Sequence, residues 1–302
     1  MKKLMLLIIS TSFSIAQVDP LEDFKTMEEL ANKIEEEVIT VKDNYFLVKG
    51  NTSSTPPYSG NIGVFNSKEG LIVIDNQWRT TYKQVKKALR EISKSKVKYI
   101  LNTHYHFDHI EGNNVFSKDG IPIISHHNVR EKLKEQVQLY DGFIQPAHDP
   151  NSLPNITFHK KMELNLEDET VEIFHFGPAH TGGDAIIKFK QGNVIHAGDV
   201  FVTYGFPFID YSNGGSIYGF IHSLTQIIGI MDNETIVIPG HGPLCNINDV
   251  ITLRDQINEC YQRVKEGKSK GESIDSIVKD IDVKLPGNRT LLEFCTDIYK
   301  NI

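Results

Sequence analysis

Hydrophobic residues recur with two different periods along the first third of the chain, and these periods separate predicted strands from a predicted helix. Runs of β-branched and aromatic residues around 38–48, 62–65 and 71–74 are bounded by Gly, Asn and Ser, which is typical of strands joined by turns. Between 80 and 93 the apolar positions follow helical spacing. A compact apolar strand is then predicted over 97–101, and a histidine-rich segment follows it directly.

The rest of the chain continues this alternation. Further strands are predicted at 122–125, 171–176, 185–189, 194–197 and 235–238, and further helices at 128–139, 216–231 and from 248 onward. A connection rich in Pro and Asn, expected to be flexible, lies over 145–155, and a capping box at Thr26 and Glu29 predicts a short helix through Glu37. Strand clusters interleaved with helices in two successive halves predict an α/β fold with sheets between helical layers.

The N-terminus predicts export. Two lysines precede an apolar stretch over 4–9, and a small residue stands at Ala16. This arrangement is typical of a secretory signal peptide over 1–16. A short membrane anchor is the alternative, but the apolar run is well below the roughly 20 residues needed to span a bilayer. We therefore expect a periplasmic or secreted protein without a stable membrane anchor, in which 17–302 form one domain that ends in a helical extension over about 248–302.

Composition and charge narrow the expected partners. With 39% hydrophobic and 24% charged residues, the 302-residue chain resembles a soluble globular protein. The formal charge of −7 argues against a nucleic-acid partner, which would require a basic surface to neutralise phosphates. We expect a small-molecule substrate instead. The three cysteines lie near the C-terminus, and a Cys260–Cys295 bridge is one option for an exported protein.

The segment after the strand at 97–101 contains four potential metal ligands within six residues: His104, His106, Asp108 and His109. Imidazole nitrogens and carboxylate oxygens are ligands that Zn²⁺ accepts, and a turn allows alternate side chains to face two adjacent ions. Isolated histidines are more often ordinary core or surface residues. We apply that interpretation to His126, His127, His148, His159, His175 and His222.

Three further candidate ligands each stand where a predicted strand gives way to a glycine-containing loop. They are His180 in GPAHTGGD, Asp199 in HAGDV and His241 in PGHG. Loops at the ends of strands are frequent sites of binding and catalytic residues. The sequence therefore predicts a metal site built from several loops.

The motifs THYHFDHIEGN, AHTGGD, AGD and PGHG, in this order and at these separations, resemble those of the metallo-β-lactamase superfamily. The resemblance implies an αββα four-layer sandwich with two Zn²⁺ ions at one edge of the sheets, and iron or manganese are alternatives to zinc. It implies that His104, His106 and His180 bind one ion, that Asp108, His109 and His241 bind the other, and that Asp199 bridges them. A bridging carboxylate is physically reasonable because two neighbouring dications repel each other strongly.

Two such ions would acidify a shared water, and the resulting hydroxide would attack the substrate. The resemblance also gives Asp108 a catalytic role, in orienting this nucleophile or in moving a proton to the leaving group. Asp75 and Asp184 are candidates either for fixing imidazole tautomers or for capping turns. The aromatic segment after Asp199 predicts an apolar substrate pocket, and the alternative is that its side chains belong to the core. Its residues are Tyr204, Phe206, Phe208 and Tyr211.

The superfamily includes β-lactamases, thioester hydrolases, lactonases, phosphodiesterases and redox enzymes, so the resemblance leaves the substrate open. The best-known β-lactamases have cysteine where this chain has Asp199, and a lysine where it has Val202. Export argues against glutathione thioesters, which are chiefly cytoplasmic. We predict a dinuclear zinc hydrolase of a small ester, lactone or amide, with β-lactam hydrolysis as the first alternative. An iron-dependent redox enzyme and a non-catalytic binding module are further alternatives.

Overall fold

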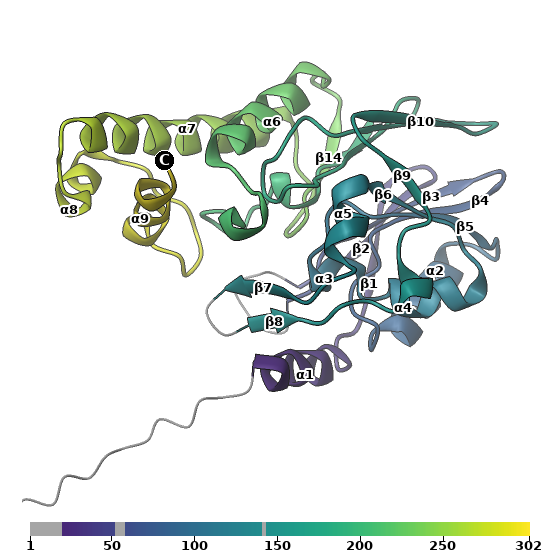
Figure 1. Ribbon diagram of the computed structural model, residues 1–302. Coiled ribbons are helices and arrows are strands. Elements are labelled where there is room, and N and C mark those ends of the chain that lie inside the picture. Colours follow the sequence, from purple (N-terminus) through teal and green to yellow (C-terminus); the bar gives the residue numbers. More distant parts are fainter. Residues whose placement is uncertain (1–19, 52–57, 141–142) are drawn as a thin grey trace, which may run out of the picture.

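Two β-sheets lie face to face and helices cover their outer faces (Figure 1). This arrangement comes from a computed structural model, which describes residues 20–51, 58–140 and 143–302. The predicted signal peptide lies outside the described residues. Within them, no helix is both long enough and apolar enough to cross a bilayer.

The first sheet has seven strands in the order β1-β2-β3-β4-β5-β6-β9. These are β1 (Glu37–Lys42), β2 (Tyr45–Lys49), β3 (Ile62–Ser67), β4 (Gly70–Ile74), β5 (Val97–Leu101), β6 (Ile123–His126) and β9 (Ile156–Phe158). Strands β1 to β4 pair antiparallel, whereas β4, β5, β6 and β9 pair parallel. The parallel pairing brings the C-terminal ends of β4 and β5 to the same edge.

The second sheet has five strands in the order β10-β11-β12-β13-β14. These are β10 (Lys161–Asn165), β11 (Thr170–Phe174), β12 (Ile186–Phe189), β13 (Val194–His196) and β14 (Ile236–Ile238). Only β13 and β14 pair parallel in this sheet. Their C-terminal ends therefore also lie side by side.

The helices divide between the two outer faces and the edges. They are α1 (Pro20–Ala31), α2 (Tyr82–Ile92), α3 (Phe107–Ile110), α4 (Asn113–Phe116), α5 (His127–Lys132), α6 (Ile217–Gly229), α7 (Ile247–Ser269), α8 (Ile274–Ile277) and α9 (Leu291–Asn301). Short 3₁₀ helices span Ser117–Asp119, Pro150–Ser152, Gly198–Val200, Tyr211–Asn213 and Val278–Asp280.

The core is layered, as the predicted αββα sandwich requires. Buried side chains of both sheets, such as Leu47 and Ile187, meet between the sheets. Val85 and Leu89 of α2 pack on the outer face of the first sheet. Helices α6, α7 and α9 pack with Ile195 and its neighbours on the outer face of the second sheet. The predicted fold is therefore confirmed.

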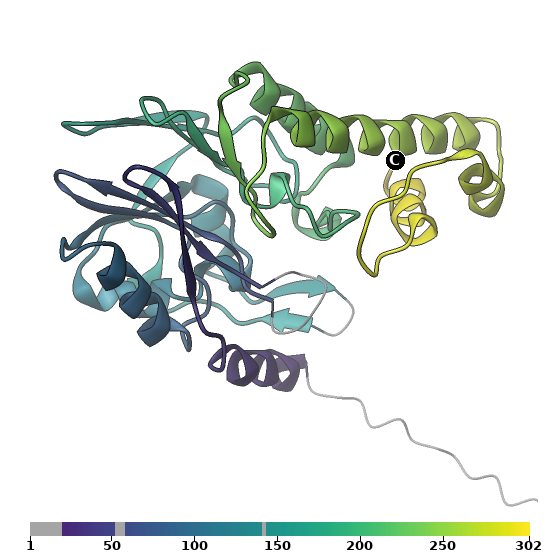
Figure 2. The same ribbon diagram turned by 180° about the vertical axis from the view of Figure 1, so that it is seen from behind.

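The C-terminal helices form a continuous extension of the second helical layer. Figure 2 shows the long helix α7 beside α6, with α9 folded back beneath α7. Cys260 of α7 and Cys295 of α9 are buried and adjacent, and their side chains hydrogen-bond to each other as free thiols. The suggested Cys260–Cys295 bridge is thus not formed in this structure.

The N-terminal helix differs from the prediction. Helix α1 begins at Pro20 and ends at Ala31, so Thr26 lies inside it and caps nothing. Proline is favoured in the first turn of a helix. The boundaries follow tertiary contacts: Phe24 packs against Trp78, and Glu28 accepts hydrogen bonds from Arg79.

The helix predicted over 128–139 is also wrong in its second half. Helix α5 ends at Lys132, and the chain continues as a hairpin of β7 (Val137–Tyr140) and β8 (Phe143–Gln145). Val137 and Leu139 are buried while the residue between them is exposed, which is the period of a strand. The loop beyond β8, predicted to be flexible, is held in part by a 2.9 Å contact between His148 Nε2 and Glu111 Oε1.

Candidate metal centre

The seven predicted ligands come from separate loops that meet at one edge of the sandwich. The loop after β5 and helix α3 contribute four of them, and the turn between β11 and β12 contributes His180. Asp199 follows β13 and His241 follows β14, so the parallel pairing of these strands brings the two together. The residues brought together and buried are His104, His106, Asp108, His109, His180, Asp199 and His241.

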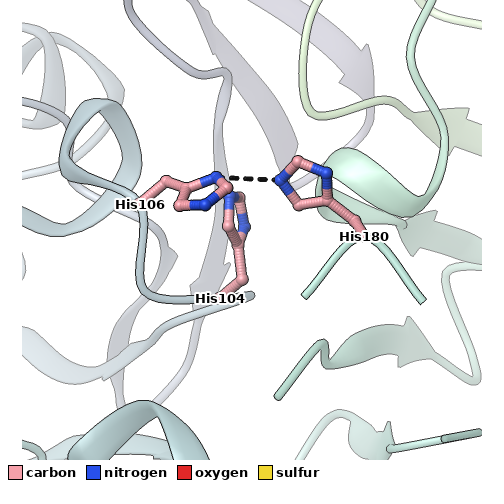
Figure 3. Close-up of side chains that lie close together, drawn as sticks. All are labelled: His104, His106 and His180. Carbon is pink, nitrogen blue, oxygen red and sulfur yellow. Dashed lines mark hydrogen bonds between the residues drawn. The ribbon is translucent and has the colours of Figure 1, made fainter. Parts of the chain in front are cut away.

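His104, His106 and His180 form the first group able to hold a metal ion, and their imidazole rings converge (Figure 3). Their potential ligand atoms lie within 4.8 Å of one another. His106 Nδ1 and His180 Nε2 are 2.9 Å apart. His104 Nε2 is buried and has no hydrogen-bond partner among the described residues. Such an atom is unfavourable unless a ligand binds it.

Asp108, His109 and His241 form the second group. His109 Nε2 and His241 Nε2 are 3.2 Å apart. Asp108 Oδ2 lies 3.1 Å from His241 Nε2 and 3.7 Å from His109 Nε2. Three ligand atoms thus face one small volume beside the first group.

Asp199 lies between the two groups. Its Oδ1 atom is 3.1 Å from His109 Nε2, and its Oδ2 atom is 3.8 Å from His180 Nε2. A Cβ atom at Gly240 would lie only 1.9 Å from Asp199 Oδ1, so glycine is required there for this carboxylate to fit. Asp199 forms a further potential metal group with His104 and His109, so its carboxylate would be placed to hold a cation between the first two groups.

The second ring nitrogen of each histidine has its own partner outside the cluster. These pairs are His104 Nδ1 with Thr103 Oγ1, His106 Nε2 with Asp210 Oδ2, His109 Nδ1 with Asp75 Oδ2, His180 Nδ1 with the Phe208 carbonyl and His241 Nδ1 with the Asn51 carbonyl. Acceptors at these positions fix the tautomer and leave the opposite nitrogen free to bind a cation.

Asp75 fixes an imidazole, one of the two roles considered for it. Its Oδ2 atom accepts from His109 Nδ1 at 2.8 Å and from Thr103 Oγ1 at 2.7 Å. Its Oδ1 atom accepts from the Thr103 amide at 2.8 Å. Asp75 has a positive φ of 61°, an uncommon conformation for a residue other than glycine. The turn at Asp75 therefore places one carboxylate where it contacts both Thr103, which precedes the first ligand, and the ligand His109.

Asp184 has the other role, that of a turn cap. Its carboxylate accepts from the Thr181 amide at 2.9 Å and from Thr181 Oγ1 at 2.7 Å. It also accepts from the Ala179 amide at 3.2 Å. These bonds close the turn on which His180 stands.

Asp210 is an important residue that the sequence analysis did not single out. It is buried, its Oδ2 atom lies 3.1 Å from His106 Nε2, and it accepts hydrogen bonds from the Tyr105 hydroxyl and Asn213 Nδ2. Its place inside the aromatic segment FPFIDYSNGG was the available signal, because an acid among apolar residues requires a partner.

The electrostatics of the cluster favour bound positive charge. Burial, helped by the neighbouring histidines, lowers the pKa of His104 and His180, which remain neutral. Burial also opposes charge on His109 and His241, but Asp199 and Asp108 outweigh it and raise their pKa. Two ionised carboxylates therefore create a field that attracts cations.

The donor set fits divalent metal ions. It combines neutral imidazoles, two carboxylates and the unsatisfied His104 Nε2 in a buried site, which is the ligand chemistry of zinc. The histidines interpreted as ordinary residues do not enter any of the potential metal groups found among the described residues.

A cavity of about 950 Å³ opens onto the cluster. His106, Asp108, His180 and Asp199 line its floor. Its walls include Tyr58, Phe107, Leu139, Tyr204, Phe206, Phe208 and residues of the segment 288–300. Three of the four predicted pocket aromatics are thus confirmed. Tyr211 is not among the described residues that line the cavity; it begins a 3₁₀ helix and packs against the hydrophobic core on the outer side of the second sheet.

Comparison with known proteins agrees with the fold and the site. The model of the metallo-β-lactamase superfamily matches residues 55–241, and the chain belongs to this superfamily. A hydroxyacylglutathione hydrolase of Pelagibacter ubique is 27% identical over 164 residues, which cover 54% of this chain and 59% of that protein. Superfamily membership and this relative, of which the match spans about three fifths, support the predicted class, a metal-dependent hydrolase.

Solved structures show the same fold in more distant proteins. A metallo-β-lactamase from Pontibacter korlensis has a TM-score of 0.59 and 15% identity, covering 74% of this chain and 99% of its own. The inverting sec-alkylsulfatase Pisa1 from a Pseudomonas species has a TM-score of 0.68 and 14% identity, covering 88% of this chain but only 50% of its own. The DIM-1 metallo-β-lactamase has a TM-score of 0.57 and 20% identity, covering 74% of this chain and 98% of its own.

Proposed function

We propose that the protein is a dinuclear zinc hydrolase that cleaves small-molecule esters, lactones or amides with an apolar portion. The main support is the meeting of two ligand groups, with Asp199 between them, on the floor of a cavity with aromatic walls. His104, His106 and His180 would hold one ion, and Asp108, His109 and His241 the other. When bound, two zinc ions supply Lewis acidity for the substrate oxygen and an acidified water as nucleophile.

The chain's own side chains have separate tasks in this proposal. Asp108, itself one of the proposed ligands, lines the cavity and is ionised, so it can accept the proton of the attacking water and pass it to the leaving group. The Tyr204 hydroxyl accepts from the Phe208 amide at 3.3 Å, which leaves its own O–H to donate to a substrate oxygen. Phe206 and Phe208 bind the apolar portion and exclude water.

The first experiment combines metal analysis with a substrate panel. The purified protein would be analysed for metal by mass spectrometry and assayed with a 4-nitrophenyl ester, a γ-lactone, a thiolactone, an anilide and nitrocefin. Assays before and after chelation, and after addition of zinc, manganese or iron, identify the active metal. We expect about two zinc ions per chain and turnover of an ester, lactone or amide that chelation abolishes.

Other outcomes would contradict the proposal in distinct ways. Turnover of nitrocefin alone would identify a β-lactamase. Activity only with iron and oxygen would identify redox chemistry, and the absence of stoichiometric metal after reconstitution would exclude the dinuclear centre.

A further inference from the structure

Helix α9 forms one wall of the cavity, although it lies outside the residues 55–241 that match the superfamily model. Leu292, Thr296 and Lys300 all line the cavity, and their spacing of four residues places them on one face of the helix. The wall is therefore a feature of this chain's C-terminal extension.

The N-terminal end of this wall is attached to the metal centre. Arg289 donates to the Pro207 carbonyl and to Asp297 Oδ2. The rings of Phe206 and Phe294 stack with centroids 5.0 Å apart. The same 204–208 segment contains Phe208, whose carbonyl accepts from His180 Nδ1 at 2.7 Å. The position of α9 is thus fixed relative to the ligands.

The cavity face of α9 is apolar at one end and cationic at the other. Leu292 has 42% of its surface exposed, an uncommon state for a large apolar side chain in this structure. Lys300 lies eight residues further along, about 12 Å along a helix axis. It is exposed, and no ion pair to another described residue accompanies it.

The other charged side chains of this wall have partners already. Arg289 pairs with Asp297. The Glu293 Oε2 atom accepts from the amide and hydroxyl of Thr290 and so caps α9. With respect to the described residues, Lys300 is therefore the cation of this wall that remains available to a ligand.

We infer that α9 selects the substrate, and that the substrate is amphipathic: its apolar portion lies on Leu292 and an anionic group at its far end meets Lys300. This inference rests on the proposed hydrolysis for its reactive carbonyl, which would lie at the histidine and aspartate floor. It predicts monoanionic esters, lactones or amides rather than neutral ones.

A pair of substrates of equal length tests the charge preference. We would compare 4-nitrophenyl hexanoate with the mono-4-nitrophenyl ester of adipic acid, whose far end is a carboxylate. The wild-type protein should have about a fivefold lower KM for the anionic ester, the size expected of one partly solvated charge pair. The preference should shrink as salt screens the charges. Lys300→Gln should abolish it.

Matched variants separate the wall from general surface effects. Lys284→Gln removes an exposed lysine that does not line the cavity, and should keep the preference. Leu292→Gln should lower kcat/KM roughly tenfold for both esters, because it removes apolar contact. Leu30→Gln, at another exposed leucine, should leave both values unchanged. Equal loss of preference in Lys300→Gln and Lys284→Gln would overturn the inference.

A binding measurement separates this inference from the proposed hydrolysis. The fluorescence of 6-(dansylamino)hexanoate and of its uncharged amide would be titrated on wild type and on Lys300→Gln, with and without chelation. We expect about fivefold tighter binding of the carboxylate, lost in Lys300→Gln and kept after chelation. If this holds while no ester is cleaved, the hydrolase proposal fails and the wall assignment stands. Equal binding of both probes would disprove the wall assignment.

Discussion

The metal cluster and the α9 wall face the same cavity but are built in opposite ways. All seven cluster side chains are buried, and the outer nitrogen of each histidine has a partner. The α9 face is largely exposed, and Lys300 forms no ion pair with the residues that the structure describes. The cluster lies within the residues that match the superfamily model, whereas the α9 wall lies beyond them. The proposed hydrolysis and the proposed selection by α9 would therefore depend on different parts of the chain.

This difference has a physical reason. A metal centre needs several ligands held rigidly, so each supporting contact restricts a side chain that the ion requires. A wall that recognises an extended substrate needs only a suitable surface at a fixed distance. Changes in the cluster should therefore alter metal binding and all substrates together. Changes in the wall should alter the choice of substrate and leave the metal in place.

The largest expected effect is at Asp199. Asp199→Asn removes the negative charge between the two ligand groups, so two neighbouring dications would repel without compensation. We expect loss of at least one ion and a fall in kcat/KM of about a thousandfold. Metal analysis and kinetics on the same sample would measure both. Retention of two ions with full activity would remove Asp199 from the bridging position.

Asp210 should have the next largest effect. Asp210→Asn weakens the acceptor for His106 Nε2, so the imidazole would be less firmly oriented and less basic. We expect metal affinity to fall roughly 10- to 100-fold. Competition with a zinc-binding dye measures this affinity. The surface variant Asp232→Asn should match wild type, and an unchanged affinity in Asp210→Asn would show that this contact does not support the ligand.

His196 is the last residue of β13, and its buried imidazole allows the buried region to be compared with the α9 wall through the pH dependence of stability. Burial lowers the pKa of His196 to about 4, from 6.5 in the unfolded chain. The unfolded state therefore binds the proton first, and wild-type stability should fall as pH decreases from 6.5 to 4. The shift corresponds to about 3 kcal/mol.

Urea unfolding at several pH values measures this dependence. The metal-free protein should be used, so that metal loss does not contribute. His196→Gln should show a smaller decrease between pH 6.5 and 4, because glutamine does not titrate. Lys300→Gln should follow the wild-type curve. A His196→Gln curve parallel to wild type would contradict the assignment.

Arg289 should give the smallest effect. Arg289→Lys keeps the charge but loses the forked geometry that joins Asp297 to the Pro207 carbonyl. We expect KM to rise about two- to threefold with little change in kcat, and metal content to stay constant. Arg254→Lys on α7 is the control. Loss of metal in Arg289→Lys would mean that the wall and the cluster are not separable.

The fold and the seven cluster residues could be predicted from the sequence because short local motifs, taken in their order, resemble those of a known superfamily. Strand periodicity and four ligands within six residues are visible in short windows. The hairpin β7–β8 was missed because its helical and strand patterns are both short, and packing of Val137 and Leu139 decided between them. The start of α1 was likewise determined by the contact of Phe24 with Trp78.

The supporting residues were harder to predict because their partners are distant in the chain. Asp210 meets His106 from 104 positions away, and Arg289 meets Pro207 from 82 positions away. The local spacing of hydrophobic and polar residues carries no information about contacts between residues so far apart in the chain. The α9 wall could not be predicted for the same reason. The spacing of Leu292, Thr296 and Lys300 is that of any helix face, and only the folded structure shows that this face lines the cavity.

Asp199 and His241 follow strands of the second sheet, whereas His104 and His109 follow β5 of the first sheet. A bound metal would therefore cross-link the two halves of the chain. The contact of His106 with His180 closes a loop of 74 residues, and that of His109 with His241 closes one of 132. Closing such loops limits the freedom of the unfolded chain, and ions that bind only the folded state shift the equilibrium toward it. Metal supply would then govern how much of this protein is folded, in addition to how fast it works.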